Sequence, residues 1–213
     1  MSSYHLTEVE IKALRPTQMT IGMEEVRLKS KEWASLDVKE RSDYLARHWF
    51  PAVKGPKNHY YIIDHHHLGL ALIKEKVRTT QLVLMQDYSS LAQDEFWAMM
   101  DHRQWVHPYD ESGKRCAFDE MPKKLVDLVD DPYRSLAGMV KRAGGFPKEG
   151  EPFTEFLWAD FFRRRVPYKL LKDDAENAFM QAIQLAHQKV AAHLPGWSGS
   201  YMHSEEGFST PLA

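Results

Sequence analysis

The polar run Asp64-His65-His66-His67 is the stretch of this chain whose residue types are best suited to chemistry. Residues 60–63 before it are aromatic or β-branched, as in a strand, and residues 68–73 after it are apolar and compatible with a helix. A helix that starts directly after a strand points unpaired backbone N–H groups outward and attracts anions. The sequence therefore predicts an anion site here, to which the carboxylate and imidazoles can add protons, hydrogen bonds or ligands.

Two other interpretations of this polar run stay open. Four polar residues at the end of a strand can form a solvated turn with no chemical role. Metal binding is a separate question, because successive strand residues point to opposite sides and three adjacent histidines reach one ion only if the turn bends them together. The identity of any metal is unknown from the sequence.

The ParB/sulfiredoxin superfamily has a similar junction. Its strand ends in Asp-Gly-His-His-Arg and leads into a helix with the pattern Leu-x-Ala-Leu, which resembles Asp64-His65-His66-His67-Leu68 and Leu70-Ala71-Leu72 of this chain. Asp64, His66 and His67 match the pattern. His65 stands where the superfamily has Gly, and Leu68 stands where it has Arg. Because an Arg fork is the usual bidentate clamp for phosphate, another cation must take its place.

The N-terminal stretch also resembles this superfamily. Arg15-Pro16-Thr17-Gln18, then Thr20-Ile21-Gly22-Met23, then Val26 with Lys29 are most similar to the branch named ParB-like nucleases. The resemblance implies that Arg15, Gln18, Lys29 and His65 bind phosphate, with Arg15 and Lys29 replacing the missing Arg.

Glu24 and Glu25 are the candidate general bases. In kinase-like members of the superfamily, which phosphorylate free serine, a glutamate from the N-terminal part is thought to act as the base. The fold implied by the resemblance would bring Glu24 and Glu25 near Asp64. The alternative is that both are solvated carboxylates favoured by a helix dipole. The catalytic candidates are therefore Asp64, His66, His67, Glu24 and Glu25.

The composition is that of an ordinary globular protein of 213 residues, with 43% hydrophobic and 27% charged residues. The formal net charge of −2 gives no general attraction to a polyanion such as DNA. Cys116 is the single cysteine, so no intrachain disulfide and no Cys-based zinc site can form. The N-terminus has no basic and apolar leader, and no apolar run approaches the roughly 20 residues that span a bilayer, so we expect a cytoplasmic protein.

The fold class predicted from the order of elements is α+β, or mixed α/β. Strands are expected over 8–14, 60–63 and 79–85, and helices over 29–33, 37–49, 68–73 and 90–101. Asp37 with Glu40 predicts a capping box for the 37–49 helix, and Pro51 ends that helix. Further along only helices are expected, over 122–129, 132–143, 153–165 and 175–194. Asp131-Pro132 predicts the cap and first residue of the 132–143 helix, and Asp173 the cap of the last one. We predict a ParB/sulfiredoxin-like unit over residues 1–105, a helical extension packed on it over 106–194, and an extended tail over 195–213.

The second half also resembles the ParB-like nuclease branch, through Pro132-Tyr133-Arg134-Ser135-Leu136-Ala137-Gly138, Gly144-Gly145 and residues 156–161. The resemblance thus covers most of the chain. Its first half carries the superfamily's site, and its second half carries no assigned chemistry.

Two functions follow from these observations. The first is binding of a nucleotide or phosphorylated small molecule, with phosphoryl transfer or nucleotide hydrolysis at the histidine-rich junction and ATP, ADP or CTP with Mg²⁺ as cofactors. Asp64 would then orient an imidazole or hold the Mg²⁺. The second is a DNA-associated nuclease or partition-type DNA-binding protein, for which Arg163-Arg164-Arg165 is a short basic run. The charge favours the first function. The sequence leaves open the acceptor substrate, the oligomeric state and whether the protein is an enzyme.

Overall fold

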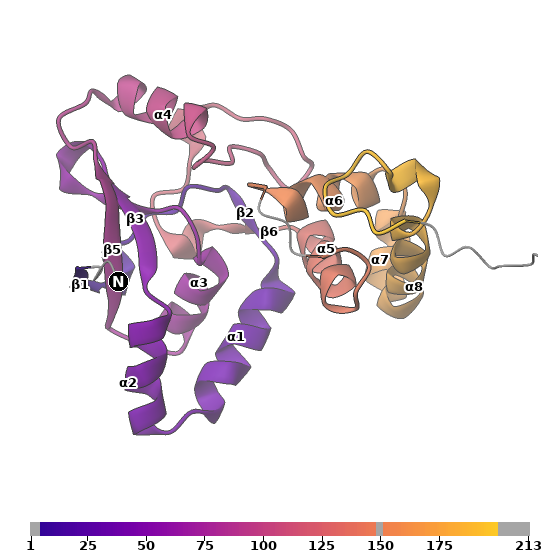
Figure 1. Ribbon diagram of the computed structural model, residues 1–213, viewed down its shortest axis with the longest axis horizontal. Helices are drawn as coiled ribbons and strands as arrows, with labels where there is room; N and C mark the ends of the chain where they lie inside the picture. Colours follow the sequence, from indigo (N-terminus) through magenta and orange to yellow (C-terminus); the bar gives the residue numbers. More distant parts are fainter. Residues whose placement is uncertain (1–4, 148–150, 200–213) are drawn as a thin grey trace, which may run out of the picture.

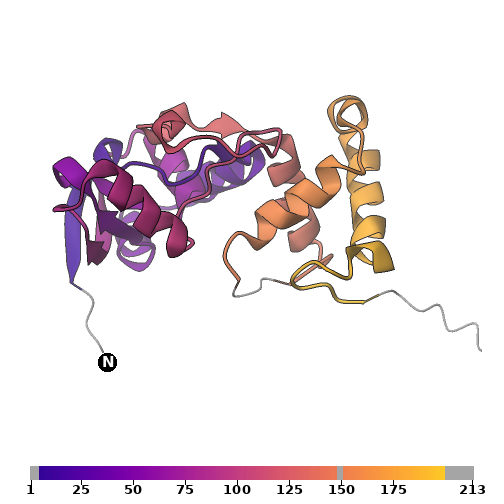
Figure 2. The ribbon, with the colours of Figure 1, turned by 90° about the horizontal axis from the view of Figure 1, so that it is seen from above.

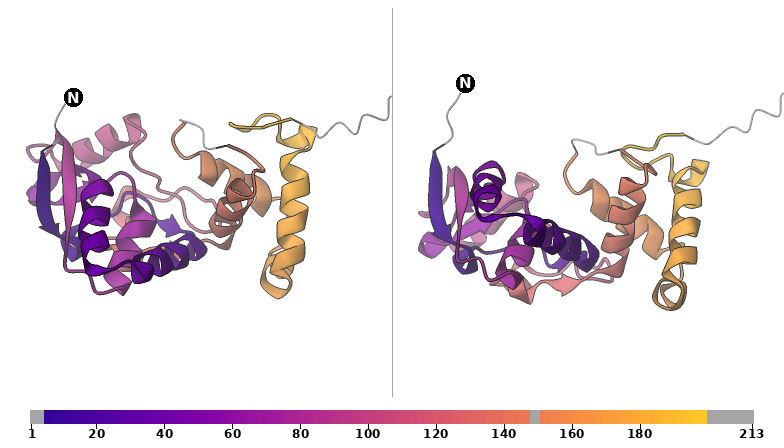
Figure 3. Two further views of the ribbon diagram at one scale, coloured as in Figure 1. Left: turned by 60° about the horizontal axis from the view of Figure 1, so that its bottom comes forward. Right: turned by 90° about the horizontal axis from the view of Figure 1, so that it is seen from below.

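The computed structural model describes residues 5–147 and 151–199 of the chain. In this part, a small sheet with its helices lies at one end and a group of helices lies at the other (Figure 1). The views from other directions show the same two parts end to end (Figures 2 and 3). None of the described helices is long and apolar enough to cross a bilayer.

The main sheet is mixed and has the strand order β1-β5-β3-β4. Strand β1 (Leu6–Glu10) is antiparallel to β5 (Thr79–Asp87), which runs parallel to β3 (Phe50–Lys54). Strand β4 (Tyr60–Ile62) is antiparallel to β3 and leads directly into helix α3 (His66–Lys74). This order places the predicted strand-to-helix junction at one edge of the sheet.

Helices cover both faces of this sheet. Helices α1 (Met23–Ser35), α2 (Val38–Arg47) and α3 share one hydrophobic core with the strands, around Phe50, Ile62 and Leu72. Helix α4 (Gln93–His102) packs on the other side, where Phe96 and Trp97 contact Tyr61. Burying both faces fixes the end of β4 and the start of α3 relative to the rest of the unit.

The helical part has a core of its own. Helices α5 (Pro132–Arg142), α6 (Thr154–Arg163), α7 (Tyr168–Asp173) and α8 (Ala175–Ala186) surround Trp158, whose ring stacks on Phe146 with the centroids 4.3 Å apart. The Trp158 indole N–H donates to the carbonyl of Pro195, so the first residues of the predicted tail lie against this core. Residues 200–213 of that tail lie outside the described residues.

A second, two-stranded sheet joins the two parts. Strand β6 (Val129–Asp130) runs parallel to β2 (Thr20–Ile21), and the Asp131 amide donates to the carbonyl of Ile21 at 2.8 Å. Asp131 is also the N-cap of α5, where its side chain accepts from the Tyr133 amide. The start of α5 is therefore held beside the start of α1 and next to the loop that precedes α1.

Several predicted elements form as expected. Asp37 caps α2 in a reciprocal capping box with Glu40, and Pro132 stands at the start of α5 behind its cap. The strand-to-helix junction and the mixed α/β class are confirmed. The 29–33 helix lies in the C-terminal half of the longer α1.

Other predicted elements are wrong or misplaced. The first strand ends at Glu10 because Ile11–Ala13 turns into a 3-10 helix with Ile11 buried. The 122–129 helix does not form, and that stretch holds a 3-10 turn, Leu125–Asp127, followed by β6. The last helix ends at Ala186 and is capped by Asp174 instead of Asp173, while α7 before it was not predicted.

Strand β3 was not predicted, because Pro51 is a helix-ending residue that is rare inside strands. The boundary at 105 also differs, since Met121, Leu125 and Leu128 pack into the cores of the sheet unit. The helical part begins at α5.

Candidate functional site

The junction between β4 and α3 leaves the start of a helix open. Its N-cap, His65, has a left-handed backbone with φ of 66° and makes no side-chain cap hydrogen bond. The first intrahelical bond runs from the Gly69 amide to the His65 carbonyl at 2.9 Å, so the amides of His66, His67 and Leu68 precede it. These are the donors that attract an anion to a helix N-terminus.

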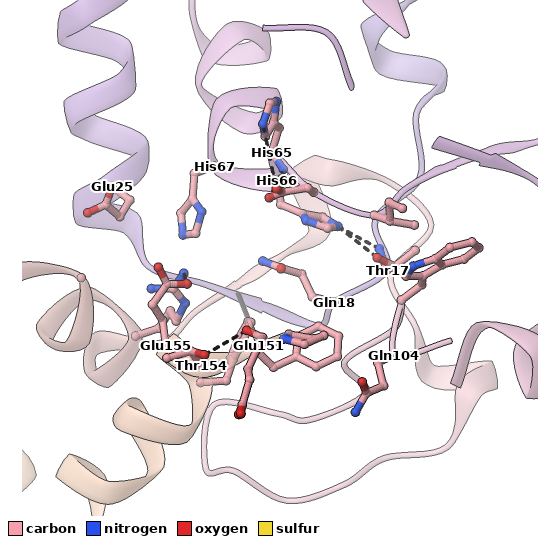
Figure 4. Close-up of a pocket in the computed structure, with 18 of the residues that line it drawn as sticks. Thr17, Gln18, Glu25, His65, His66, His67, Gln104, Glu151, Thr154 and Glu155 are labelled. Carbon is pink, nitrogen blue, oxygen red and sulfur yellow. Dashed lines mark hydrogen bonds and ion pairs between the residues drawn. The ribbon is translucent and has the colours of Figure 1, made fainter. Parts of the chain in front are cut away.

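His66 is buried at this junction, with 5% of its surface exposed. Its Nε2 accepts a hydrogen bond from the Thr17 amide at 3.1 Å, and the Thr17 hydroxyl donates to the carbonyl of Ile62 at 2.9 Å (Figure 4). Burial lowers the pKa of His66 to about 4, although the nearby Asp64 carboxylate opposes this shift. The ring is therefore neutral at pH 7 and acts as an acceptor that fastens the Thr17 loop to α3.

His67 makes the same type of contact one residue further along the chain. Its Nε2 accepts from the Gly22 amide at 3.3 Å, directly before α1. Burial, and then the positive charge of Arg134, hold the pKa of His67 well below its usual range. Because Nε2 accepts, the proton of the neutral ring is on Nδ1, which leaves His67 one N–H to donate toward a ligand.

The junction opens into a cavity of about 540 Å³ between the sheet unit and the helical part. The size is within the usual range for small-molecule sites. The sheet unit contributes one wall and the helical part the facing wall (Figure 4). The residues from the sheet unit include Thr17, Gln18, Glu25, Pro51, Ile63, Asp64, His65, His66 and His67. Those from the connection and the helices include Gln104, Trp105, Arg134, Gly138, Lys141, Glu151, Phe153, Thr154, Glu155 and Phe156.

Arg134 and Lys141 of α5 are the cations in this cavity. The Arg134 side chain is 8% exposed and donates to Glu155 at 3.0 Å, and Lys141 pairs with the same carboxylate. The Nε of Arg134 is buried and has no hydrogen-bond partner among the described residues. Burial lowers the pKa of Arg134, while the charges of Glu155, Asp131 and Asp64 raise it. One carboxylate therefore serves two cations, which leaves this group with a net positive charge.

The sequence alone did not point to Arg134, the buried cation that lines this cavity. The signal was present, because Arg134 belongs to the Pro132–Gly138 motif that resembles the same branch. No chemistry was attached to that motif, since only the fold brings α5 to the start of α3.

The structure separates the other predicted residues into two groups. Gln18, Glu25, Asp64 and His65 line the cavity with the two histidines. The Gln18 side-chain Nε2 donates to the Thr20 carbonyl at 2.7 Å, and Glu25 forms an ion pair with Arg142. Asp64 is at the rim, with its side chain 72% exposed, and accepts from the His65 amide at 2.6 Å.

Arg15, Lys29 and Glu24 do not line the cavity. Arg15 contacts His59 at 2.9 Å and lies over the ring of Tyr61. Lys29 pairs with Glu32 at 2.8 Å, and Glu24 pairs with Arg27. The three residues assigned to phosphate binding or base catalysis from the resemblance therefore lie on other surfaces.

The residues do not form a transition-metal centre. Within the two described ranges, no group of three or more His, Cys, Asp or Glu side chains is arranged to hold a metal ion. This agrees with the engagement of both Nε2 atoms by backbone amides.

His65 is the residue whose replacement by Gly should test the geometry of the junction. A left-handed backbone costs a non-glycine residue about 1–2 kcal/mol. Loss of the edge contact between His65 and Phe50, with ring centroids 6.0 Å apart, offsets part of the gain. We expect His65→Gly to remain folded, to gain up to about 1 kcal/mol in free energy of unfolding, and to bind anions as well as or better than the parent protein.

Urea denaturation measures this effect. Lys76→Gly is the matched control, since Lys76 has φ of 59° but does not line the cavity. If Lys76→Gly stabilises the protein while His65→Gly destabilises it, the imidazole of His65 holds the junction together and the backbone argument is wrong.

Most of the chain matches one known protein family. The model of the family described as "Putative ParB-like nuclease" matches residues 7–164. This chain belongs to the ParB-like nuclease family. The match runs from β1 beyond the end of α6, so it includes both walls of the cavity. The recognition made from the Asp-His junction is thereby confirmed.

Two solved structures are similar to this ParB-like protein. The crystal structure of protein Atu1540 from Agrobacterium tumefaciens is 46% identical with a TM-score of 0.87, covering 93% of this chain and 99% of that one. The chromosome-partitioning protein ParB from Caulobacter crescentus, C-terminally truncated and in complex with CTP-gamma-S, is 12% identical with a TM-score of 0.32. That match covers 85% of this chain and 97% of that one. No curated protein matches this chain.

Proposed function

We propose that this ParB-like protein binds the phosphate groups of a nucleotide or phosphorylated small molecule at the N-terminus of α3. The observation that supports this most is that an open helix start and a buried arginine line the same cavity. The amides of His67 and Leu68 and the Nδ1–H of His67 would donate from one wall. Arg134 and Lys141 would supply positive charge from the other wall.

The charges are compatible with an anion only in the inner part of the cavity, which lies around the two cations of α5. Arg142 neutralises Glu25, and Glu155 neutralises one of its two cations. The remaining carboxylates, Asp64 and Glu151, are exposed. We propose that the terminal phosphates lie in the inner part and that Asp64, at the rim, approaches a Mg²⁺ carried by ATP, ADP or CTP.

Phosphoryl transfer or nucleotide hydrolysis is the reaction class that this arrangement supports best. Such reactions depend on positioning and charge stabilisation of the phosphoryl group, which buried cations and helix amides supply, and bound Mg²⁺ neutralises charge on the same oxygens. The neutral His67 ring can donate a hydrogen bond from its Nδ1–H to the transferred group. Glu25 can serve as a base only if it leaves Arg142, so it is the weaker candidate of the catalytic residues in the cavity.

A nuclease is the second candidate, and the family's description favours it. The charge of −2 and the arginine run oppose duplex DNA as the ligand. Arg163 pairs with Asp131 and Asp160, and Arg165 lies over the Phe161 ring at 4.0 Å. Arg164 donates to the Asp160 carbonyl at 3.0 Å. The run therefore supports the helical core more than it presents a basic surface.

A thermal-shift screen separates these functions. The protein is heated with ATP, ADP, CTP or inorganic phosphate, each with and without Mg²⁺, and with single-stranded DNA at about 0.15 M salt. A ligand at 100 times its Kd stabilises the folded state by about 2.7 kcal/mol. We expect a nucleotide to stabilise the protein and to be turned over with Mg²⁺. Stabilisation by DNA alone, with Mg²⁺-dependent DNA cleavage, would favour the nuclease.

A further inference from the structure

Three aromatic side chains line the cavity and form what we call its aromatic wall. Trp105 and Phe153 are half-buried, and Phe156 is buried. We propose that Trp105 and Phe153 form a stacking site for the planar base of a nucleotide whose phosphates lie at the start of α3. This inference rests on the proposed phosphate site and adds the class of compound that carries the phosphate.

Phe153 belongs to a cluster of packed rings. The His107 ring lies 3.9 Å from Phe156, 4.6 Å from Tyr109 and 4.9 Å from Phe153, measured between centroids. Burial lowers the pKa of His107 to about 3, so it stays neutral and packs as an aromatic ring. The Phe153 ring is therefore held in place before any ligand arrives, which reduces the entropy lost on binding.

Two of the residues that line the cavity have a backbone conformation that is unfavourable for non-glycine residues. Phe153 has φ of 60° and Gln104 has φ of 54°, both in the left-handed region. A bulky aromatic residue there is an outlier, and such residues concentrate at ligand sites. With His65, three of the six non-glycine residues with positive φ in the described chain line this cavity.

The aromatic wall adjoins the buried cation Arg134. The guanidinium of Arg134 lies 5.1 Å from the centroid of Phe156, and the same guanidinium pairs with Glu155 in the inner part. If the phosphates of a ligand contact Arg134, the rest of that ligand can therefore contact the aromatic wall. In Figure 4, Gln104 is drawn on the opposite side of the cavity from Glu25 and His67. Its exposed amide can donate to and accept from the edge of a base.

The chemistry favours a nucleotide over a phosphate compound without a ring. Inorganic phosphates and sugar phosphates would use Arg134 and the helix amides but leave the Trp105 and Phe153 surfaces in water. Stacking of a base on an aromatic ring removes apolar surface from water on both partners. The structure thus predicts that the base adds affinity beyond that of the phosphate chain.

The experiment compares ATP and CTP with tripolyphosphate, which has the same phosphate chain and no base. Dissociation constants are measured by calorimetry for the parent protein, for Trp105→Leu and Phe153→Leu, and for Tyr168→Leu. Tyr168 is the matched control, because it is 58% exposed on α7 and does not line the cavity. We expect the two cavity variants to weaken nucleotide binding at least about fivefold, with tripolyphosphate binding and Tyr168→Leu unchanged.

The possible failures are distinct. If neither nucleotide nor tripolyphosphate binds the parent protein, the proposed phosphate site is wrong and the base site falls with it. If tripolyphosphate binds as tightly as ATP and CTP, the phosphate site stands and the base site is wrong. The base site is also wrong if both cavity variants bind nucleotides as tightly as the parent protein. Because both side chains are half-buried, the two variants check each other against a loss of folding in one.

Discussion

Replacing Arg134 by Gln should weaken the binding of a phosphate-containing ligand by about 30-fold or more. Arg134 is buried in the cavity, its Nε has no partner among the described residues, and it is one of two cations that share Glu155. Removing a buried, charge-assisted contact to an anion costs about 2–5 kcal/mol. Lys141 remains to pair with Glu155, so we expect the variant to fold. Calorimetry with ADP or tripolyphosphate measures the loss.

Two further variants show whether the geometry of Arg134 matters. Arg134→Lys keeps the charge but removes the planar fork, and we expect an intermediate affinity. Arg165→Gln removes an equal charge outside the cavity, where Arg165 lies over Phe161, and should leave binding unchanged. Equal losses in Arg134→Gln and Arg165→Gln would mean that only overall charge attracts the ligand, and the site assignment would fail.

Lowering the pH from 6.5 to 4 should destabilise the folded protein, in part through His66. The pKa of this ring is about 4 in the folded state, because the ring is buried, against 6.5 for a free imidazole. Between these values the unfolded chain takes up a proton that the folded chain does not. The contribution of His66 is therefore complete above pH 6.5, falls by about 3 kcal/mol as the pH drops to 4, and changes little below that.

Urea denaturation at a series of pH values tests this dependence. His66→Gln should be less stable than the parent protein at pH 7, because the Thr17 amide loses a well-placed acceptor, and its stability should fall less steeply between pH 6.5 and 4. His102→Gln, at an exposed position on α4, should retain the parent slope. If all three proteins lose stability in parallel, His66 takes up a proton in the folded state and is not the neutral acceptor described above.

Local signals in the sequence predicted a large part of the fold. The capping box of Asp37 and Glu40 and the Asp131-Pro132 pair each act within one turn of helix, so their outcome hardly depends on distant residues. The change from strand to helix between β4 and α3 was equally local. Strand β3 was missed for the opposite reason. Its five residues include Pro51, and it forms because β4 and β5 pair with it on both sides.

The site was predicted from one wall only. Asp64, His66 and His67 were found from their run and from the family resemblance, and they do lie at the cavity. The hydrogen-bonding role of His66 could not be predicted from the sequence, because its partner is the Thr17 amide in a loop distant along the chain. The same applies to Arg134 and Phe153, whose position depends on the packing of α5 and α6. Arg15 and Lys29 were assigned from the resemblance, and the fold turns both toward other partners.

The most direct test of the proposed phosphate site is a crystal structure of the protein soaked with ADP and Mg²⁺. We predict phosphate density at the start of α3, within hydrogen-bond distance of the His67 and Leu68 amides and of the Arg134 guanidinium. Phosphate bound at Arg15 or Lys29 instead, or an empty cavity at a concentration that saturates binding in solution, would contradict the central claim.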